Sequence, residues 1–188
     1  MDDDTARPAS GTGIATLARL QRGTTTQEAL AFFDASPAVP VDRLLGSWGG
    51  SGLPTGHRLD GVLEALGWSG KRFDGPEDCH PLLFDDGQGG VVDVNPLFIP
   101  MPLVQRLAGV LRRPMAGRWF RAVLPVLRTR RPRARLRMIE HRGVVTAAMT
   151  YDAHPIDDVF RAVDDDTLLG LMDLRGMDRP FFFVLRRS

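Results

Sequence analysis

Cysteine, lysine and long apolar runs are nearly missing from this chain of 188 residues. The single cysteine, Cys79, excludes an intramolecular disulfide and agrees with a reducing compartment. Its neighbour His80 would point to the opposite face of a strand, so we expect an idle thiol rather than a nucleophile. The amino end is acidic where a secretory signal would be basic, and no apolar run reaches the ~20 residues that a membrane-spanning helix needs. We therefore expect a cytoplasmic protein.

The sequence also lacks the motifs of the common enzyme classes. It has no Gly-x-x-x-x-Gly-Lys-Ser phosphate loop and no Gly-x-Ser-x-Gly nucleophile elbow. The three acids of residues 164–166 suit a solvated turn better than a metal or acid–base cluster. The histidines show no spacing typical of a zinc site: His57, His80, His141 and His154. We expect a non-enzymatic protein with no catalytic residues, no bound metal and no cofactor.

Acidic residues are absent from a long central segment. Residues 106–137 hold eleven arginines and no acid, which leaves 13 basic and 23 acidic side chains elsewhere, although the net charge is only +1. A block of one sign usually has a partner of the other sign, and the candidates are nucleic acid, an anionic membrane surface or the protein's own acidic face. Apolar residues recur with a helical period over residues 103–127, and Pro114 divides them into two helices.

The first part of the chain reads as helical. We expect a flexible amino-terminal tail over residues 1–22, in which residues 14–21 could form a short helix. Thr25 and Glu28 form a capping box, which starts a helix that ends before residue 37. Asp60 is the expected cap of a short helix over residues 61–66, which would act as a lid across the mouth of a barrel.

Four glycines surround Trp48 in residues 46–52, where the helical pattern changes to strands. Glycine lets the backbone bend sharply or approach another chain closely, and the tryptophan offers a large apolar plug for the closed end of a barrel. Small ligand-holding barrels often begin with Gly-x-Trp. A bulged strand with an ordinary core tryptophan is the alternative.

The last third of the chain is the clearest β region. Five segments separated by short turns predict an antiparallel meander: residues 135–141, 144–151, 156–163, 167–174 and 181–187. Residues 81–84 and 91–94 read as two further strands joined by a glycine-rich loop. Because open edge strands invite aggregation, we expect all these strands to close into a barrel. The expected organisation is one domain over residues 23–188, made of a first part (23–100), an arginine-rich helical insertion (101–133) and the meander (134–188).

The residues also resemble a known bacterial family. The segments Gly46-Ser47-Trp48-Gly49-Gly50, Leu66-Gly67-Trp68 and Gly70-Lys71-Arg72-Phe73 are similar to the GXWXG family. Arg135-Leu136-Arg137-Met138 to Pro180-Phe181-Phe182-Phe183 resembles the companion domain of unknown function that usually follows it. The two resemblances cover about residues 31–187. They imply a mainly β, antiparallel, lipocalin-like β-barrel with accessory amino-terminal and mid-chain helices, which binds phospholipid or another acyl-chain lipid.

Lipid binding needs apolar, flexible walls and a cation or hydroxyl for the head group. The expected wall residues are Met138, Met149, Phe160, Leu168, Met172 and Phe182, which could instead fill a barrel core without a cavity. The head-group candidates are Arg137, Tyr151, Arg161 and Lys71. Trp68 and Phe73, on either side of the lysine, are expected to contact the ligand as well. An internal ion pair or plain exposure is the alternative for each arginine, and a solvated loop position is the alternative for the lysine.

The arginine-rich helices offer a second surface. We expect them to contact an anionic membrane, from which the ligand would be loaded, through Arg112, Arg113, Arg118, Trp119 and Arg121. The alternative is that these helices only cap the barrel. Nucleic acid is disfavoured because few aromatic residues are interleaved with the arginines for base stacking. Gly-x-Trp-x-Gly-x-Gly also resembles the opening of haem-binding nitrobindin barrels, which keeps haem as an alternative cofactor with His141 or His154 as the ligand.

Overall fold

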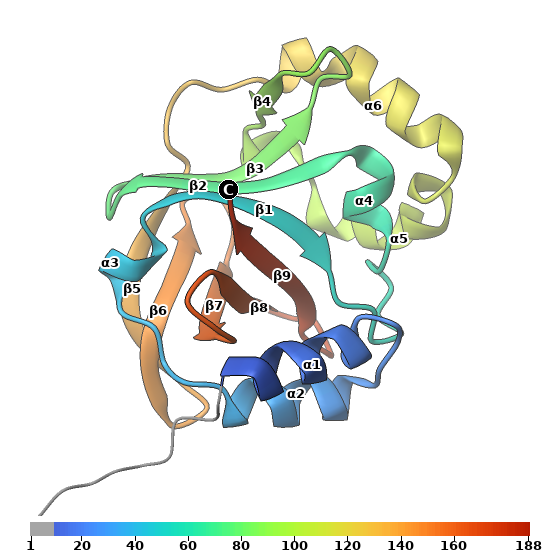
Figure 1. The fold of residues 1–188 in the computed structure, drawn as a ribbon. Helices are drawn as coiled ribbons and strands as arrows, with labels where there is room; N and C mark the ends of the chain where they lie inside the picture. Colours follow the sequence, from blue (N-terminus) through green and yellow to red (C-terminus); the bar gives the residue numbers. More distant parts are fainter. Residues whose placement is uncertain (1–9) are drawn as a thin grey trace, which may run out of the picture.

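In the computed structural model, which describes residues 10–188, nine antiparallel strands form one sheet with helices packed around it (Figure 1). The strands are β1 (Gly46–Gly52), β2 (Trp68–Gly75), β3 (Asp78–Asp85), β4 (Val91–Asp93), β5 (Ala134–His141), β6 (Val144–Tyr151), β7 (Ile156–Ala162), β8 (Thr167–Leu174) and β9 (Phe181–Arg187). Their order is β2-β1-β9-β8-β7-β6-β5-β3-β4, and β2 also pairs with β3. This last pairing joins all the strands except β4 into a closed arrangement, here called the ring. The expected mainly β, antiparallel fold is confirmed.

The ring is closed by unequal contacts. β1 and β9 are joined by five residue pairs, from Trp48 with Arg187 to Gly52 with Phe183. β3 and β5 share a single pair, Cys79 with Ala134, here called the seam. Cys79 is fully buried there, and its burial raises the pKa of the thiol to about 12. The thiol therefore stays protonated near neutral pH, in agreement with a structural role.

Two amino-terminal helices, α1 (Ser10–Leu20) and α2 (Thr26–Ala35), pack on the outer face of the sheet. The short helix α3 (Val41–Leu44) follows them, and its buried residue Leu44 belongs to the apolar cluster of the ring interior. The capping box of α2 is present, with Thr25 accepting from the Glu28 amide and Glu28 reaching back to the Thr25 amide. Leu17 and Leu20 of α1 are buried in an apolar cluster between these helices and the strands. Residues 10–20 are thus a packed helix rather than part of a flexible tail, and residues 1–9 of that tail lie outside the described residues.

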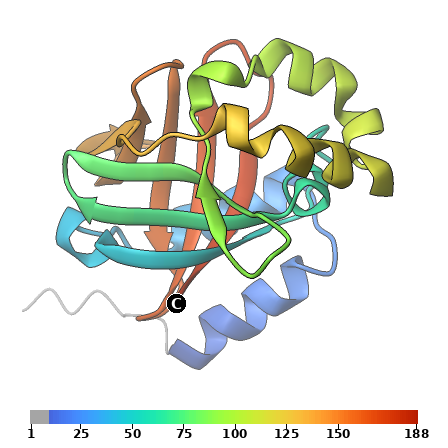
Figure 2. The same ribbon diagram turned by 90° about the horizontal axis from the view of Figure 1, so that it is seen from above.

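Four further helical segments gather on the other side of the molecule, away from α1 (Figure 2). They are α4 (Val62–Leu66), the 3-10 helix η1 (Pro96–Phe98), α5 (Met101–Leu111) and α6 (Pro114–Leu127), together called the cap. Pro114 begins α6 as expected, and α6 continues through Pro125 to its end. Asp60 does not cap α4: its carboxylate accepts instead from the amides of Thr55 and His57. No helix within residues 10–188 is long and apolar enough to cross a membrane.

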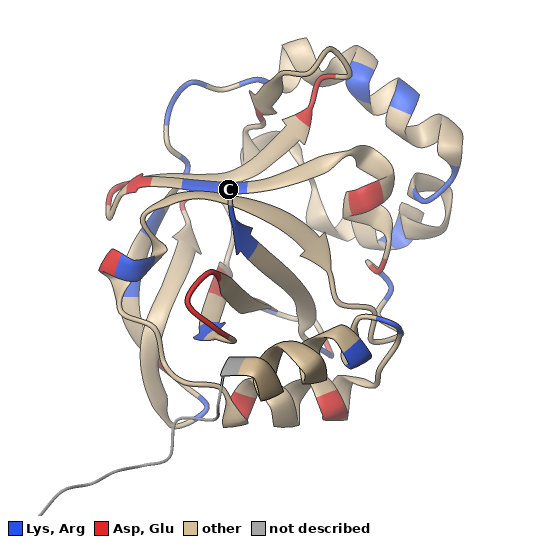
Figure 3. Cartoon of the chain, viewed as in Figure 1, with Lys and Arg blue, Asp and Glu red and all other residues tan. Residues whose placement is uncertain are grey.

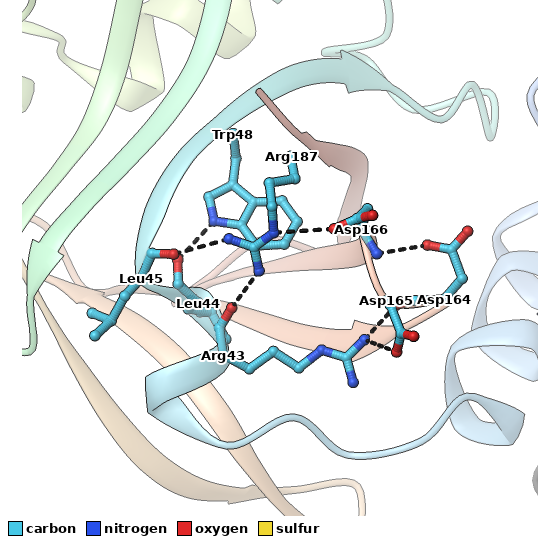
Figure 4. Close-up of polar contacts among 8 residues, drawn as sticks. All are labelled: Arg43, Leu44, Leu45, Trp48, Asp164, Asp165, Asp166 and Arg187. Carbon is cyan, nitrogen blue, oxygen red and sulfur yellow. Dashed lines mark hydrogen bonds and ion pairs between the residues drawn. The ribbon is translucent and has the colours of Figure 1, made fainter.

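Trp48 is almost completely buried in the ring, and its position is fixed by three neighbouring segments (Figure 4). Its indole Nε1 donates to the Leu44 carbonyl at 2.7 Å. The guanidinium carbon of Arg187 lies 4.3 Å from the centre of the indole ring. The nitrogens of Arg187 donate to the carbonyls of Arg43 and Leu45 and to Asp166 at 3.0, 3.1 and 3.2 Å.

Gly50, two residues after Trp48, is required by a close approach. A Cβ atom at this position would overlap the ring of Trp68 on the neighbouring strand. Gly49 faces ordinary contacts instead, since a Cβ there would lie 3.7 Å from its nearest neighbour, the Arg186 carbonyl. Gly50, and not Gly49, therefore leaves the space that the ring of Trp68 occupies.

Candidate functional site

A cavity of about 240 Å³ lies between the inner face of the ring and the cap. Its strand residues include Trp68, Leu82, Phe84, Ile156, Met172, Phe181 and Phe183. Its other apolar walls come from the cap and the residues beside it, including Leu59, Val62, Leu63, Leu66, Phe98, Ile99, Met101, Val104, Leu111, Phe120 and Leu127. Four polar side chains also line it: Lys71, Tyr151, His154 and Asp158. The interior is thus not a fully packed core at this end of the ring.

Lys71 and Asp158 form a buried ion pair in the cavity wall. The Lys71 Nζ lies 2.7 Å from Asp158 Oδ2, and the two side chains are 3% and 1% exposed. The same Nζ donates to the Pro81 carbonyl at 3.1 Å and to the Tyr151 hydroxyl at 3.3 Å, and that hydroxyl donates to Asp158 Oδ2 at 3.2 Å. The ammonium also lies 5.0 Å from the ring centre of Phe183. The Lys71 ammonium therefore contacts three side chains and one main-chain carbonyl. The alternative that this lysine lies in a solvated loop is wrong.

A bulge in β2 brings Lys71 to the inner face. The pairing of β2 with β3 shifts register between Trp68 and Gly70 and again between Gly70 and Arg72. Gly70 has a φ of 135°, and a Cβ there would collide with the Trp48 carbonyl. Strand residues three apart normally face opposite sides, but a bulge changes this alternation. Trp68 and Lys71 consequently both face the cavity.

Burial perturbs the acid groups of this cluster. The pKa of Asp158 is raised by its removal from water, although the neighbouring Lys71 and the hydrogen bond from Tyr151 oppose this shift. Burial and the nearby Asp158 carboxylate together raise the pKa of Tyr151 well above its usual value.

Two polar atoms on cavity-lining residues have no hydrogen-bond partner among residues 10–188: Asp158 Oδ1 and Trp68 Nε1.

The expected ligand residues are spread over several parts of the molecule. Trp68, Lys71, Tyr151 and Met172 line the cavity. Phe73, Met149 and Phe160 are buried in the apolar cluster of the ring interior without lining it, as is Leu168. Phe182 belongs to the outer cluster beneath α1 and α2.

Three of the expected ligand residues lie elsewhere. Met138 is 47% exposed. Arg137 pairs with Glu77 at 2.7 Å near the surface. Arg161 is buried, but it lies against Phe33 of α2 on the outer face of the sheet, with its guanidinium carbon 5.2 Å from the ring centre. Neither arginine is part of the cavity, so neither supplies a head-group contact there.

Asp158 was missed when the sequence was considered alone. Its signal is a pair of adjacent acids, Asp157 and Asp158, near the start of β7 and directly before the apolar residues Val159 and Phe160. Asp157 points to the other face, where it accepts from the Thr150 hydroxyl at 2.6 Å. Only the strand register decides which of the two adjacent acids faces inward.

The two histidines considered as haem ligands lie in different environments. His154 lines the cavity, and its Nε2 donates to the Pro96 carbonyl at 2.7 Å. His141 lies outside this cavity, beside Phe33. Within residues 10–188, no group of three or more histidine, cysteine or acidic side chains is arranged to hold a metal ion.

The outer face of the cap is both apolar and basic. Its exposed apolar side chains are Leu97, Phe98, Leu103, Leu107, Val110, Met115, Trp119, Val123 and Val126. Arg112, Arg113 and Arg118 are exposed among them, and Arg121 is partly buried with its side chain near Gly87. Figure 3 shows basic segments on α6 and in the link between α5 and α6. Trp119 is 70% exposed, which is unusual for so large an apolar side chain.

Comparison with known proteins identifies both parts of the ring. The GXWXG protein family matches residues 31–89, which contain β1, β2 and β3, and a domain of unknown function (DUF4334) matches residues 132–187, which contain β5 to β9. No curated protein matches the chain. A crystal structure of a protein from Thermomonospora curvata is similar, with 29% identity and a TM-score of 0.69 over 95% of this chain and 98% of that one. The helices α5 and α6 lie between the two family matches, and the cavity is lined from both matched regions and from these helices. The resemblance expected from the sequence is thus confirmed: residues 31–89 form a GXWXG region, and residues 132–187 form the DUF4334 region that accompanies it.

Proposed function

We propose that this protein is a non-enzymatic carrier that holds one small lipid, of the size of a single fatty-acyl chain, inside a lipocalin-like barrel. The observation that carries the proposal is the cavity between the ring and the cap, whose walls are almost wholly apolar. Ligand pockets are typically concave and apolar with a few polar groups that orient the ligand. The cluster of Lys71, Tyr151 and Asp158 supplies such polar groups on one wall.

The size of the cavity narrows the lipid class. Its volume of about 240 Å³ is just below the usual range of roughly 300–1,000 Å³ for small-molecule pockets. A single acyl chain or a small cyclic hydrocarbon suits this space better than a phospholipid with two chains. The same limit argues against haem, a larger and rigid group.

The cap supports loading at an anionic membrane. α5 and α6 carry the cavity residues Val104 and Phe120 on one side and exposed apolar residues such as Trp119 on the other. Apolar side chains beside arginines enter the head-group layer of a membrane while the arginines meet anionic lipids. The helices that would contact the membrane are therefore the same helices that cover the cavity. A cytoplasmic protein peripheral to the membrane is the setting that we propose.

The carrier function is tested by analysing the lipid content of gently purified protein. Native mass spectrometry followed by organic extraction should detect a bound single-chain lipid. Delipidated protein should then take up fatty-acyl compounds from vesicles. Protein that carries no lipid and takes up none would contradict the proposal, while an absorption band near the Soret region on haemin titration would favour haem.

A further inference from the structure

Every donor of the Lys71 cluster already has an acceptor. The three protons of the Lys71 ammonium match three oxygens: the Pro81 carbonyl, the Tyr151 hydroxyl and Asp158 Oδ2. The proton of the Tyr151 hydroxyl is used by Asp158 Oδ2 as well. The lysine therefore has no proton left for a ligand, and its charge is balanced by its own carboxylate partner.

One acceptor of the cluster remains free. Asp158 is 1% exposed, lines the cavity, and its Oδ1 has no hydrogen-bond partner within residues 10–188. A buried carboxylate oxygen without a partner is costly, and such an oxygen in a ligand pocket is satisfied by a donor on the ligand. The other free polar atom on a cavity residue is a donor, Trp68 Nε1.

We infer that the cavity selects a neutral apolar alcohol, whose hydroxyl donates to Asp158 Oδ1. The inference rests on the proposed carrier function and names the ligand's polar group. A hydroxyl is the smallest group that both donates and accepts, so it can also accept from Trp68 Nε1. A carboxylate or phosphate head group has no proton for Asp158 and would place a second negative charge beside it.

This assignment reverses what the basic residues of the sequence suggest. Arg137 and Arg161 lie outside the cavity, and Lys71, which among residues 10–188 is the one lysine or arginine that lines it, is already paired. An anionic head group would have to displace Asp158 from the lysine to gain a contact. The charged pair thus acts as a fixed acceptor in an apolar wall, with the lysine favouring the ionised form of the carboxylate and orienting it.

A matched ligand series on the unaltered protein tests the inference. Dissociation constants are measured by calorimetry for n-octanol, its isomer heptyl methyl ether, n-nonane and octanoate at neutral pH. A hydrogen bond to a charged group predicts that octanol binds about 10- to 100-fold more tightly than the ether or the alkane, with octanoate weakest. Equal binding of all four would overturn the alcohol assignment alone, as would tightest binding of octanoate. Binding of none of them would overturn the carrier function itself.

Substitutions at single residues test whether Asp158 causes the preference for octanol. Asp158→Asn keeps the shape of the side chain but weakens its acceptor, and it should reduce the preference for octanol over the ether to a few-fold. Asp157→Asn, on the other face of the same strand, is the matched control and should keep the full preference. Trp68→Phe removes the second free atom but keeps an aromatic ring, so a loss of octanol affinity without loss of nonane affinity is expected. If Asp158→Asn does not fold, the ligand series on the unaltered protein still decides the question.

Discussion

The guanidinium of Arg187 stacks on the indole of Trp48, 4.3 Å from its centre, and thereby joins the two family regions of the ring. Trp48 belongs to β1 and Arg187 to β9, and the two residues are directly paired in the sheet. The stack combines a cation over an aromatic face with hydrogen bonds to two carbonyls at the carboxyl end of α3. We therefore expect Arg187 to contribute to the stability of the pairing between β1 and β9.

Arg187→Ala should lower the free energy of unfolding by about 1–2 kcal/mol, because it removes the stacking and the hydrogen bonds together. Arg187→Lys should recover little of this loss, since lysine lacks the planar fork that reaches both carbonyls. Urea denaturation followed by circular dichroism measures the change. Arg175→Ala, at an exposed turn, is the control and should stay within about 0.5 kcal/mol of the unaltered protein.

The buried pair of Lys71 and Asp158 should show strong coupling. Lys71→Met alone leaves a buried carboxylate without its partner and should destabilise the protein by about 3–5 kcal/mol. The double variant Lys71→Met, Asp158→Leu should be much less destabilised than the sum of the two single variants. A double-mutant cycle in urea gives the coupling free energy. The exposed pair of Arg135 and Asp152 is the comparison, and its coupling should not exceed about 1 kcal/mol. Simple additivity at the buried pair would contradict the ion pair.

The raised pKa of Asp158 predicts a pH dependence of stability. Because the folded carboxyl holds its proton to a higher pH than the ordinary value of 3.8, the unfolded chain ionises first as pH rises. This group's contribution to stability is therefore greatest at low pH and falls as pH rises from the unfolded pKa through the folded pKa. Asp158→Asn has no such contribution. The unfolding free energy of the unaltered protein minus that of the variant should accordingly be larger near about pH 4 than near about pH 7. A difference that grows with pH would contradict the raised pKa.

Gly50→Ala should disturb the cavity from a distance. The added methyl group overlaps the ring of Trp68, so the ring must move, and overpacking of this kind typically destabilises by about 1–3 kcal/mol. Because Trp68 lines the cavity, ligand affinity should fall as well. Gly49→Ala is a matched control one residue away, where the methyl group meets only ordinary contacts. Equal effects of the two substitutions on octanol binding would show that Gly50 has no special relation to the cavity.

The cap should bind anionic membranes through its exposed face. Trp119→Ser and Arg118→Glu should each weaken cosedimentation with phosphatidylglycerol vesicles, the arginine change by about tenfold or more because it removes one favourable charge and adds an unfavourable one. Binding to neutral phosphatidylcholine vesicles should be weak for all forms. Val145→Ser, which removes an exposed apolar side chain from β6, is the control. Unchanged vesicle binding in both cap variants would contradict the membrane contact.

Local patterns predicted the meander well, since its strands are short segments rich in apolar residues that are separated by short turns. The expected segment 144–151 is β6, and 167–174 is β8. β2 was not predicted as a strand because the bulge at Gly70 interrupts its alternation. The pairing of Lys71 with Asp158 joins residues 87 positions apart, so no local pattern could reveal it. The two expected head-group arginines failed for a related reason: composition does not tell which face of a strand a side chain occupies or which acid it meets.

The single residue pair at the seam has a further consequence for how the chain can be divided. A break between α6 and β5 would yield two pieces, one with β1 to β4 and the cap, the other with β5 to β9. Each piece would expose strand edges that the other pairs, at β1 with β9 and at β3 with β5. The first piece would also take α1 and α2 with it, and this would expose the apolar outer face of the strands in the second piece. The two halves are thus complementary fragments, and mixing them should regenerate the cavity, which neither half can enclose by itself.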